Sequence, residues 1–449
     1  MNTRIATGDG LAPLPRLLAV FVMTCAVCAC SLTFGIVNAA LPVMSTALNV
    51  TPQDTVALVA SFQVSMVATL IPLAALGEIV GYRRVYLAGL AVFGLSSAMI
   101  SASGQFEAAL FWRFVQGVGA AGVLSVNTAI LRFVYPRASF GRGLGLNAFV
   151  AGSSTALGPS VAAVVLSLAN WHWLFLLNVP ICIVALIIGA IIVPETPRAD
   201  RRLNIISLLQ HLFAMVALLS AIQLIAIRGL SAGSVVLAVV GVTALGLYLA
   251  RECKRDVPLF PIDLLRIRPF RLSVSASVLA FAAQIVVLTV VPFWLDRAMQ
   301  ASQAEIGYLL SLWPMMSMLA ALASGVLLDR FTARRLGIAG MVIFGFGLLI
   351  LAFVHPGTPY FIVGAVMILC GLGFGLFQTP NNKMMLSAAP EERAGSASGS
   401  LGTARMIGQS FGSAGAAVAL AFSPATALNI SVPLALLLAG AAAVASANR

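Results

Sequence analysis

The sequence has little charge and many long apolar runs. Only 9% of its 449 residues are Asp, Glu, Lys or Arg, 60% are apolar, and the mean hydropathy is +1.03. Soluble domains carry about 25% charged residues, so this composition lies far outside their range. Apolar runs of roughly 20 residues, long enough to cross a hydrocarbon core of about 30 Å as helices, recur from end to end. The sequence therefore predicts an all-α integral membrane protein.

The sequence also lacks the usual parts of an enzyme or of an ATP-driven motor. The P-loop pattern G-x-x-x-x-G-K-[ST] is absent, and no loop exceeds roughly 20 residues, which is too short for an attached domain. Cys25 and Cys28 form a Cys-x-x-Cys pair without a second pair of ligands, and there are only three histidines. We therefore expect no enzymatic activity, no metal and no cofactor. Any uphill transport must draw on an ion gradient.

Lysine is nearly absent, with two residues against 24 arginines, yet the net charge is +12. The distribution of this charge argues against a nucleic-acid partner. With fourteen spans and the N-terminus inside, 22 of the 26 Lys and Arg lie on one side, as expected for basic loops that set membrane orientation. We therefore expect a monomer in the lipid bilayer of a bacterial inner membrane, with many spans and with both termini in the cytoplasm.

An internal repeat divides the chain. "ALGEIVGYRR" (75–84) and "VLLDRFTARR" (326–335) each join the second and third spans of a six-span block, and their acids and last arginines are 251 residues apart. Repeated halves are typical of secondary transporters. The predicted organisation is a cytoplasmic N-terminus over 1–16, a six-helix bundle over 17–193, two extra helices with flanking loops over 194–271, and a second six-helix bundle over 272–446. The segment 255–271 is either a short amphipathic piece at the inner surface or a plain loop.

The two repeated loops lie at the predicted cytoplasmic mouth. Acids and arginines there can pair with helix ends across the interface between the bundles, and such pairs strengthen when closure excludes water. We expect a cytoplasmic gate formed by Glu78, Arg83, Arg84, Asp329, Arg330, Arg334 and Arg335. The alternative is that these charges only set the topology.

Charge within the spans is rare, and Arg113 in "LFWRFVQGVGAAG" (110–122) is the clearest case. It lies six residues after Glu107, about 9 Å along a helix from the predicted outer end. A charge at that depth costs at least a few kcal/mol unless it is paired or faces water, so a functional role is the default interpretation. Snorkelling of the side chain to the surface is the alternative. The repeat has no counterpart, because the residue 251 positions later is Gly364.

Several motifs resemble the major facilitator superfamily, and above all its fourteen-span drug:proton antiporter branch. The resembling stretches are "LGEIVGYRR" (76–84), "RFVQGVGAAG" (113–122), "ALGPSVAA" (156–163), "WHWLFLLNVP" (171–180), "GLGFGLFQTPNN" (371–382) and "SASGSLGTARMIGQSFG" (396–412). The resemblance implies a major facilitator fold with two six-helix bundles plus two extra central helices, fourteen transmembrane helices in all. It also implies that Gly158 and Pro159 belong to an antiporter motif and that Arg113 takes part in proton coupling.

The first span departs from the pattern of this branch. In "TFGIVNAALP" (33–42), Thr33 stands where the branch typically has an aspartate, and no Asp or Glu lies in the middle of any predicted span. The remaining candidates for proton coupling are Arg113 together with Glu107 and Asp296, two acids near the outer surface. Glu107 is also explained as an anion stabilised at a helix N-terminus.

The same departure bears on the substrate. Lipophilic cations are usually held by an embedded carboxylate with aromatic neighbours, whereas the buried charges here are Arg113 and Arg405, with His211 as a further possibility. A neutral or anionic substrate is therefore favoured. The side chains that we expect to contact it are Asn38, Gln63, Gln116, Gln284, Trp313, Gln378 and Asn381. Each of them is equally suited to bonding a neighbouring helix.

The sequence thus predicts a secondary active transporter that exports small amphiphilic compounds or drugs by alternating access, in exchange for protons. Two alternatives remain open. The first is a transporter of a specific anionic metabolite on the same fold, with Arg113 holding the anion. The second is a membrane sensor or scaffold that transports nothing, although a scaffold has no need of two matched gates.

Overall fold

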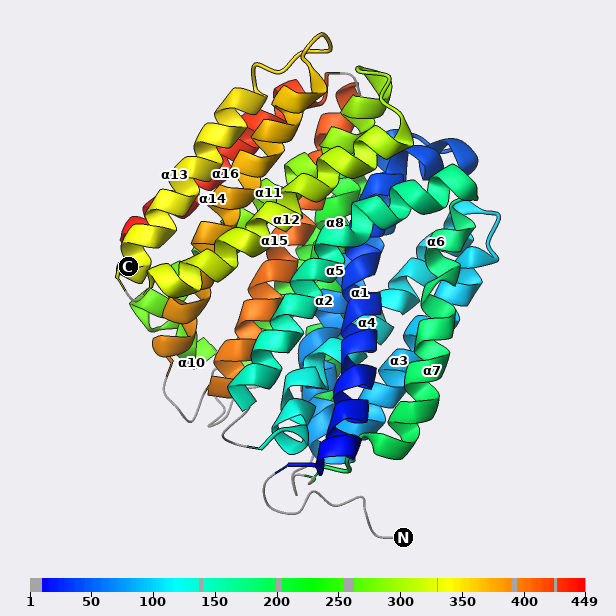
Figure 1. Ribbon diagram of the computed structural model, residues 1–449, viewed down its shortest axis with the longest axis vertical. Coiled ribbons are helices and arrows are strands. Elements are labelled where there is room, and N and C mark those ends of the chain that lie inside the picture. Colours follow the sequence, from blue (N-terminus) through cyan, green and yellow to red (C-terminus); the bar gives the residue numbers. More distant parts are fainter. Residues whose placement is uncertain are drawn as a thin grey trace.

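The chain folds into a bundle of long helices (Figure 1). The computed structural model describes residues 10–136, 140–196, 198, 204–252, 262–328, 330–389, 394–423 and 426–448, and every regular element in these residues is a helix. Within this part of the chain, twelve helices are long and apolar enough to cross a bilayer, or thirteen when α5, bent by 40°, is counted as one span. The predicted all-α membrane fold is confirmed.

The helices form two halves joined by a middle section. The first half contains α1 (Pro13–Ala47), α2 (Pro52–Val80), α3 (Tyr82–Ser101), α4 (Phe106–Val134), α5 (Phe140–Leu168), α6 (His172–Leu176) and α7 (Asn178–Ile192). The middle section contains α8 (Ile205–Arg228), α9 (Ala232–Glu252) and α10 (Ile262–Leu265). The second half contains α11 (Arg268–Arg297), α12 (Gln303–Leu327), α13 (Ala333–Leu351), α14 (Tyr360–Ser387), α15 (Ala394–Phe422) and α16 (Leu428–Ala447). We call the face at which α1 begins the N-terminal face.

Local sequence explains where several helices begin and end. Thr51 precedes α2, and its hydroxyl accepts a hydrogen bond from the backbone N–H of Asp54 at 3.0 Å. Ser302 and Glu305 form a capping box at the start of α12, which satisfies two backbone donors that the helix leaves free. Gly81 ends α2 with a φ of 99°, a conformation that favours glycine and lets the chain turn directly into α3.

The two halves repeat the same helix packing. Contacts between α1 and α5, α2 and α4, and α3 and α4 recur as contacts between α11 and α15, α12 and α14, and α13 and α14. A Cβ atom on Gly89 of α3 would lie 2.8 Å from the Cα of Gly122 of α4. The positions 251 residues later are Gly340 and Gly373, where a Cβ on Gly340 would lie 2.7 Å from the carbonyl oxygen of Gly373. The sequence repeat therefore extends to the points at which helix backbones touch.

Hydrogen bonds between the halves lie away from the N-terminal face. They join Thr289 to Asn38 (3.3 Å), Ser413 to Gln63 (2.7 Å) and Ser160 to Ser311 (2.6 Å), with a further contact from Ser153 to the sulfur of Met318 (3.1 Å) near the middle of the helices. Asn38 and Thr289 are 251 residues apart. The repeat-related helices α1 and α11 thus meet at equivalent positions.

The apolar core, like these hydrogen bonds, joins the two halves mainly away from the N-terminal face among the described residues. One cluster joins the halves, and its members from the first half include residues 36–44 of α1 and 56–59 of α2, which pack with residues 287–295 of α11. Towards the N-terminal face, the described apolar residues form separate clusters, one mainly within the first half and one around Leu264 and Phe270 of the second. In this structure the halves are closed together at the face opposite the N-terminal face.

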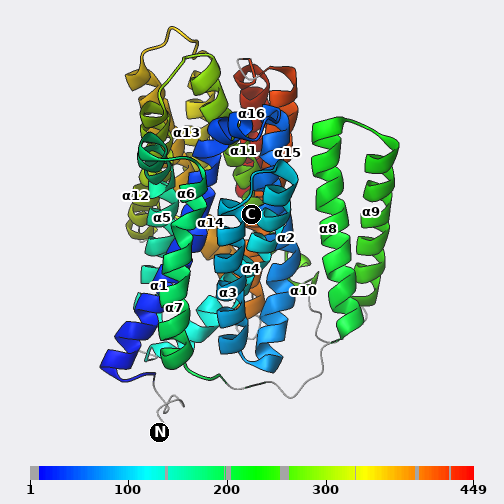
Figure 2. The same ribbon diagram turned by 90° about the vertical axis from the view of Figure 1, so that its right-hand side faces the viewer.

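The extra helices α8 and α9 stand beside the bundle, with α9 outermost (Figure 2). α8 contacts α2 of the first half and α15 of the second. The Gln53 amide donates to the carbonyl oxygens of Ala226 (3.1 Å) and Ile227 (2.5 Å), and the Gln223 amide donates to that of Ser410 (2.7 Å). α8 is therefore hydrogen-bonded to both halves.

Candidate functional site

Arg113 lies inside the first half, where its side chain is only 2% exposed. Its Nε donates to the carbonyl oxygen of Leu58 at 3.0 Å, and its Nη1 donates to Oε1 of Gln116 at 2.5 Å. The Gln116 amide in turn donates to Oγ of Ser97 at 2.7 Å. This chain links α2, α3 and α4, so the predicted snorkelling alternative does not describe the side chain, which points into the bundle.

Aromatic rings complete the surroundings of Arg113. Its guanidinium carbon lies 4.4 Å from the ring centroid of Phe62 and 5.8 Å from that of Phe175. Ring faces stabilise a desolvated cation. Among the described residues no carboxylate lies within ion-pair distance, so the positive charge is held by a carbonyl, an amide oxygen and two rings. The charge is therefore compensated by neutral groups alone among the described residues.

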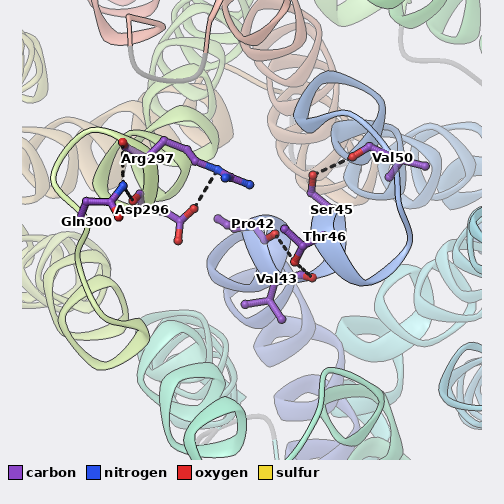
Figure 3. A network of polar contacts seen from close by, with 8 residues as sticks. All are labelled: Pro42, Val43, Ser45, Thr46, Val50, Asp296, Arg297 and Gln300. Carbon is purple, nitrogen blue, oxygen red and sulfur yellow. Dashed lines mark hydrogen bonds and ion pairs between the residues drawn. The ribbon is translucent and has the colours of Figure 1, made fainter.

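The structure does not bring the two candidate acids to Arg113. Glu107 is exposed in the first turn of α4. Asp296 belongs to the other half, near the end of α11, and its carboxylate lies 3.2 Å from Nε of Arg297. Figure 3 shows this pair beside the end of α1, with the Arg297 side chain extending toward that end, while the amide of Gln300 caps the last carbonyls of α11. Participation of these acids in proton coupling stays a prediction.

The expected substrate contacts fall into three groups. Asn38 and Gln63 bond across the interface between the halves, as described above. Gln116 and Asn381 each lie in a hydrogen-bond network inside their own half. In the second half, the Asn381 amide donates to Oγ of Ser277 at 2.6 Å. Gln284 and Gln378 are partly exposed on α11 and α14, and Trp313 is fully buried with its ring 5.5 Å from that of Phe344.

Among the predicted gate residues, the contacts of Arg83 stay within the first half. Arg83 pairs with Glu195 at 3.2 Å and donates to the carbonyl oxygen of Ala190, both in the first half. Four other arginines of the predicted gate, Arg84, Arg330, Arg334 and Arg335, are exposed, Glu78 is partly exposed, and Asp329 lies outside the described residues. The N-terminal face is the one at which the halves lack hydrogen bonds to each other among the described residues, so the gate hypothesis applies to a state in which that face is closed.

Gly158 and Pro159 lie where α5 crosses two other helices. A Cβ on Gly158 would lie 2.5 Å from the Cα of Gly35 on α1, so the two backbones touch. A Cβ on Gly307 of α12 would lie 2.8 Å from the carbonyl oxygen of Pro159. The predicted antiporter motif therefore holds α5 against its own half and against the other half at the same level.

Two polar clusters did not emerge from the sequence as sites. The first follows α15, where Arg405, Gln409 and Ser413 recur at a spacing of four and share one face of the helix. The second is buried between α8 and α9, where the rings of His211 and Tyr248 are 5.2 Å apart and Glu252 is also fully buried. Glu252 is the last residue of α9.

Comparison with known proteins agrees with this architecture. Residues 23–413 match the Major Facilitator Superfamily, and the chain belongs to that superfamily. Its members are transporters, so the predicted class of protein is confirmed. The uncharacterized transporter YebQ of Escherichia coli K12 is 39% identical over 98% of this chain and 97% of its own length. The riboflavin transporter RibZ of Clostridioides difficile is 26% identical over 85% and 83%, and the multidrug efflux pump LfrA of Mycolicibacterium smegmatis is 28% identical over 79% and 70%.

Proposed function

We propose that the protein exports small amphiphilic compounds from the cytoplasm across a bacterial inner membrane by alternating access, in exchange for protons. The observation that carries this proposal is the one-sided closure of the two repeated halves. Hydrogen bonds and an apolar cluster join them at one face, and separate clusters form toward the other. Alternating access requires such a pair of bundles rocking about a central site.

The orientation follows from charge. The exposed arginines of both repeated loops lie at the N-terminal face, and basic loops mark the cytoplasmic side. The state seen here is then open to the cytoplasm and closed to the outside, with both termini in the cytoplasm. Efflux and resistance proteins among the relatives support export of amphiphilic compounds, and the Arg113 network supports coupling to protons.

Proton exchange tests the proposed function directly. Everted vesicles that contain the protein are acidified inside by respiration, and a dye reports the internal pH while cationic, neutral and anionic amphiphiles are added in turn. We expect at least one compound to cause recovery of the dye signal, because protons leave as substrate enters. Vesicles without the protein are the control. No recovery with any compound, in vesicles shown to contain folded protein, rejects proton antiport.

A disulfide across the closed face is expected to stop transport. The hydroxyl oxygens of Ser160 and Ser311 are 2.6 Å apart on α5 and α12, so cysteines at both positions can reach disulfide geometry. Oxidation of the double variant Ser160→Cys/Ser311→Cys, in a background without the native cysteines, should abolish exchange, and a reductant should restore it. Transport that continues after complete cross-linking, measured by loss of free thiol, would contradict alternating access at this interface.

A further inference from the structure

Arg405 lies near the middle of α15, twelve residues into a helix of 29. Its guanidinium carbon is 5.2 Å from the ring centroid of Phe281 on α11. Two glycines make this approach possible, because a Cβ on Gly408 would lie 2.9 Å from the Cβ of Phe281, and a Cβ on Gly412 would lie 2.6 Å from the carbonyl oxygen of Ala282. The close packing of α15 on α11 thus presents the arginine over an aromatic ring at mid-membrane depth.

The surroundings of Arg405 differ from those of Arg113. Arg405 is partly exposed, its buried Nε has no hydrogen-bond partner, and no described carboxylate lies within ion-pair distance. Arg113 instead is fully enclosed and bonded to Leu58 and Gln116. A guanidinium whose buried Nε has no acceptor is costly inside a membrane, so an arginine in this state is suited to an incoming anion.

Further polar atoms without partners lie along the same seam between α15 and α2. Gln409 is one turn from Arg405, and its buried Oε1 has no partner. One more turn along, Ser413 donates to Oε1 of Gln63 at 2.7 Å, which leaves Nε2 of Gln63 without an acceptor. The seam therefore offers Arg405 Nε and Gln63 Nε2 as donors over roughly two helical turns, about 12 Å.

Aromatic side chains border this polar seam. The ring of Phe281 lies 5.1 Å from that of Phe374 in an edge-to-face arrangement, and Phe374 continues to Phe344 at 6.0 Å. On the other side, Phe62 precedes Gln63 on α2 and lies 5.1 Å from Phe34. The Phe281 ring beside the guanidinium is thus held in place by its packing on Phe374, and an amphiphile whose polar group meets Arg405 would bring its aromatic body to that ring.

We propose that Arg405, with the amide N–H of Gln409 one turn away, binds the acidic group of an amphiphilic organic anion such as an aromatic carboxylate, while Nε2 of Gln63, two turns away, donates to a second acceptor further along the same molecule. The proposal rests on the transport function inferred above and names its substrate class. A planar guanidinium suits a carboxylate through paired hydrogen bonds. The absence of an embedded carboxylate in the first span agrees with this substrate class, because a carboxylate there would repel the anion. A potential that is negative inside also drives an anion outward, by about 2.3 kcal/mol per charge and 100 mV.

Three compounds with one ring system and different charge test this proposal. Binding of naphthoate, naphthamide and naphthylmethylammonium is measured by titration calorimetry with the protein in nanodiscs of phosphatidylcholine, which contain no anionic lipid. Empty nanodiscs correct for partition into the bilayer. We expect the carboxylate to bind at least about tenfold more tightly than the amide, the equivalent of one charge-assisted hydrogen bond, and the ammonium to bind least.

Substitutions test whether Arg405 is the source of the preference for the carboxylate over the amide. Arg405→Gln should remove the tenfold preference for the carboxylate, and Arg405→Lys, which keeps the charge, should retain part of it. Arg228→Gln makes the same chemical change at an exposed residue at the end of α8 and should bind as the wild type does. Gln409→Leu leaves the charge of Arg405 in place but removes the neighbouring amide N–H. It should therefore weaken naphthoate binding about threefold. Thermal unfolding in the same nanodiscs checks that each variant is folded.

Three binding outcomes and one transport outcome overturn the proposal. The binding outcomes are naphthoate that does not bind, naphthoate that binds no more tightly than naphthamide, and a preference that survives in Arg405→Gln. These results are independent of proton coupling because the nanodiscs hold no gradient. If naphthoate binds as expected while vesicles show no proton exchange, the anion site stands and the proposed antiport fails. If vesicles exchange protons only for cationic compounds, the antiport stands and the anion site fails.

Discussion

Replacement of Arg113 by leucine is expected to reduce proton-linked transport at least about tenfold while lowering the stability of the fold by only about 1–2 kcal/mol. The guanidinium is a fixed charge in a region of low dielectric constant, where a unit charge 4 Å away feels about 4 kcal/mol at an effective dielectric constant near 20. In the proposed mechanism that field acts on the proton or substrate in transit. Its loss should remove the coupling, together with the one hydrogen bond from α4 to the Leu58 carbonyl of α2.

The stability part of this prediction follows from what surrounds Arg113. Its desolvation is offset by the Leu58 carbonyl, the Gln116 amide and two rings, and leucine removes that desolvation cost but leaves the buried Oε1 of Gln116 without a donor. A buried neutral acceptor without a donor costs less than a buried charge without an acceptor. We expect the free energy of unfolding in nanodiscs to fall by about 1–2 kcal/mol. The dye assay with everted vesicles measures the transport part.

Gln116→Leu is the matched control. This change leaves the charge of Arg113 in place but takes away the acceptor of its Nη1, so the fold should lose about 2–3 kcal/mol. A residue with a purely structural role would give the reverse order, with Arg113→Leu the more damaging change. Wild-type exchange by a folded Arg113→Leu protein would show that Arg113 does not take part in coupling.

The fold was predictable because its signals are long and repeated. Apolar runs of membrane length, one-sided basic loops and the offset of 251 residues each depend on many positions, so no single substitution obscures them. The structure adds that Gly89 and Gly122 in the first half, and Gly340 and Gly373 in the second, occupy equivalent points of backbone contact between helices. These glycines were readable from the sequence only once the helix pairs that they join were known.

The candidate site was less predictable because it depends on which helices face each other. The sequence singled out Arg113 by its depth, and the structure shows that side chain buried, but its partner Leu58, and the Ser97 that accepts from Gln116, lie on other helices and carry no pattern. Arg405 was visible as a buried charge. Its contact with Phe281 depends on the close approach of α11 and α15, which spacing within one helix does not reveal.

Replacement of Gly158 by alanine is expected to abolish exchange, although it adds a single methyl group. The new Cβ would lie 2.5 Å from the Cα and 2.7 Å from the carbonyl carbon of Gly35, and these backbone atoms cannot rotate away. α1 and α5 must therefore move apart. Overpacking of this kind costs about 1–3 kcal/mol, which thermal unfolding in nanodiscs measures.

The same helix provides the control. A methyl group added at Gly152 of α5 would meet only the Cγ of Met318, at 3.8 Å, which is ordinary van der Waals contact. Gly152→Ala should therefore leave exchange unchanged and stabilise the helix by up to about 1 kcal/mol, since alanine is the better helix former. Equal effects of the two substitutions would show that the crossing at Gly158 is not tight.

The effect of Gly158→Ala should fall on transport rate more than on binding. α5 contacts α12 through Ser160 and Ser311 two residues beyond Gly158, so a shift of α5 away from α1 changes the interface that must open and close. The polar seam of α15 lies on other helices and is left intact. Titration calorimetry should therefore show naphthoate binding within about twofold of wild type while exchange in vesicles is lost, and binding that falls in parallel with exchange would place Gly158 in the binding site instead.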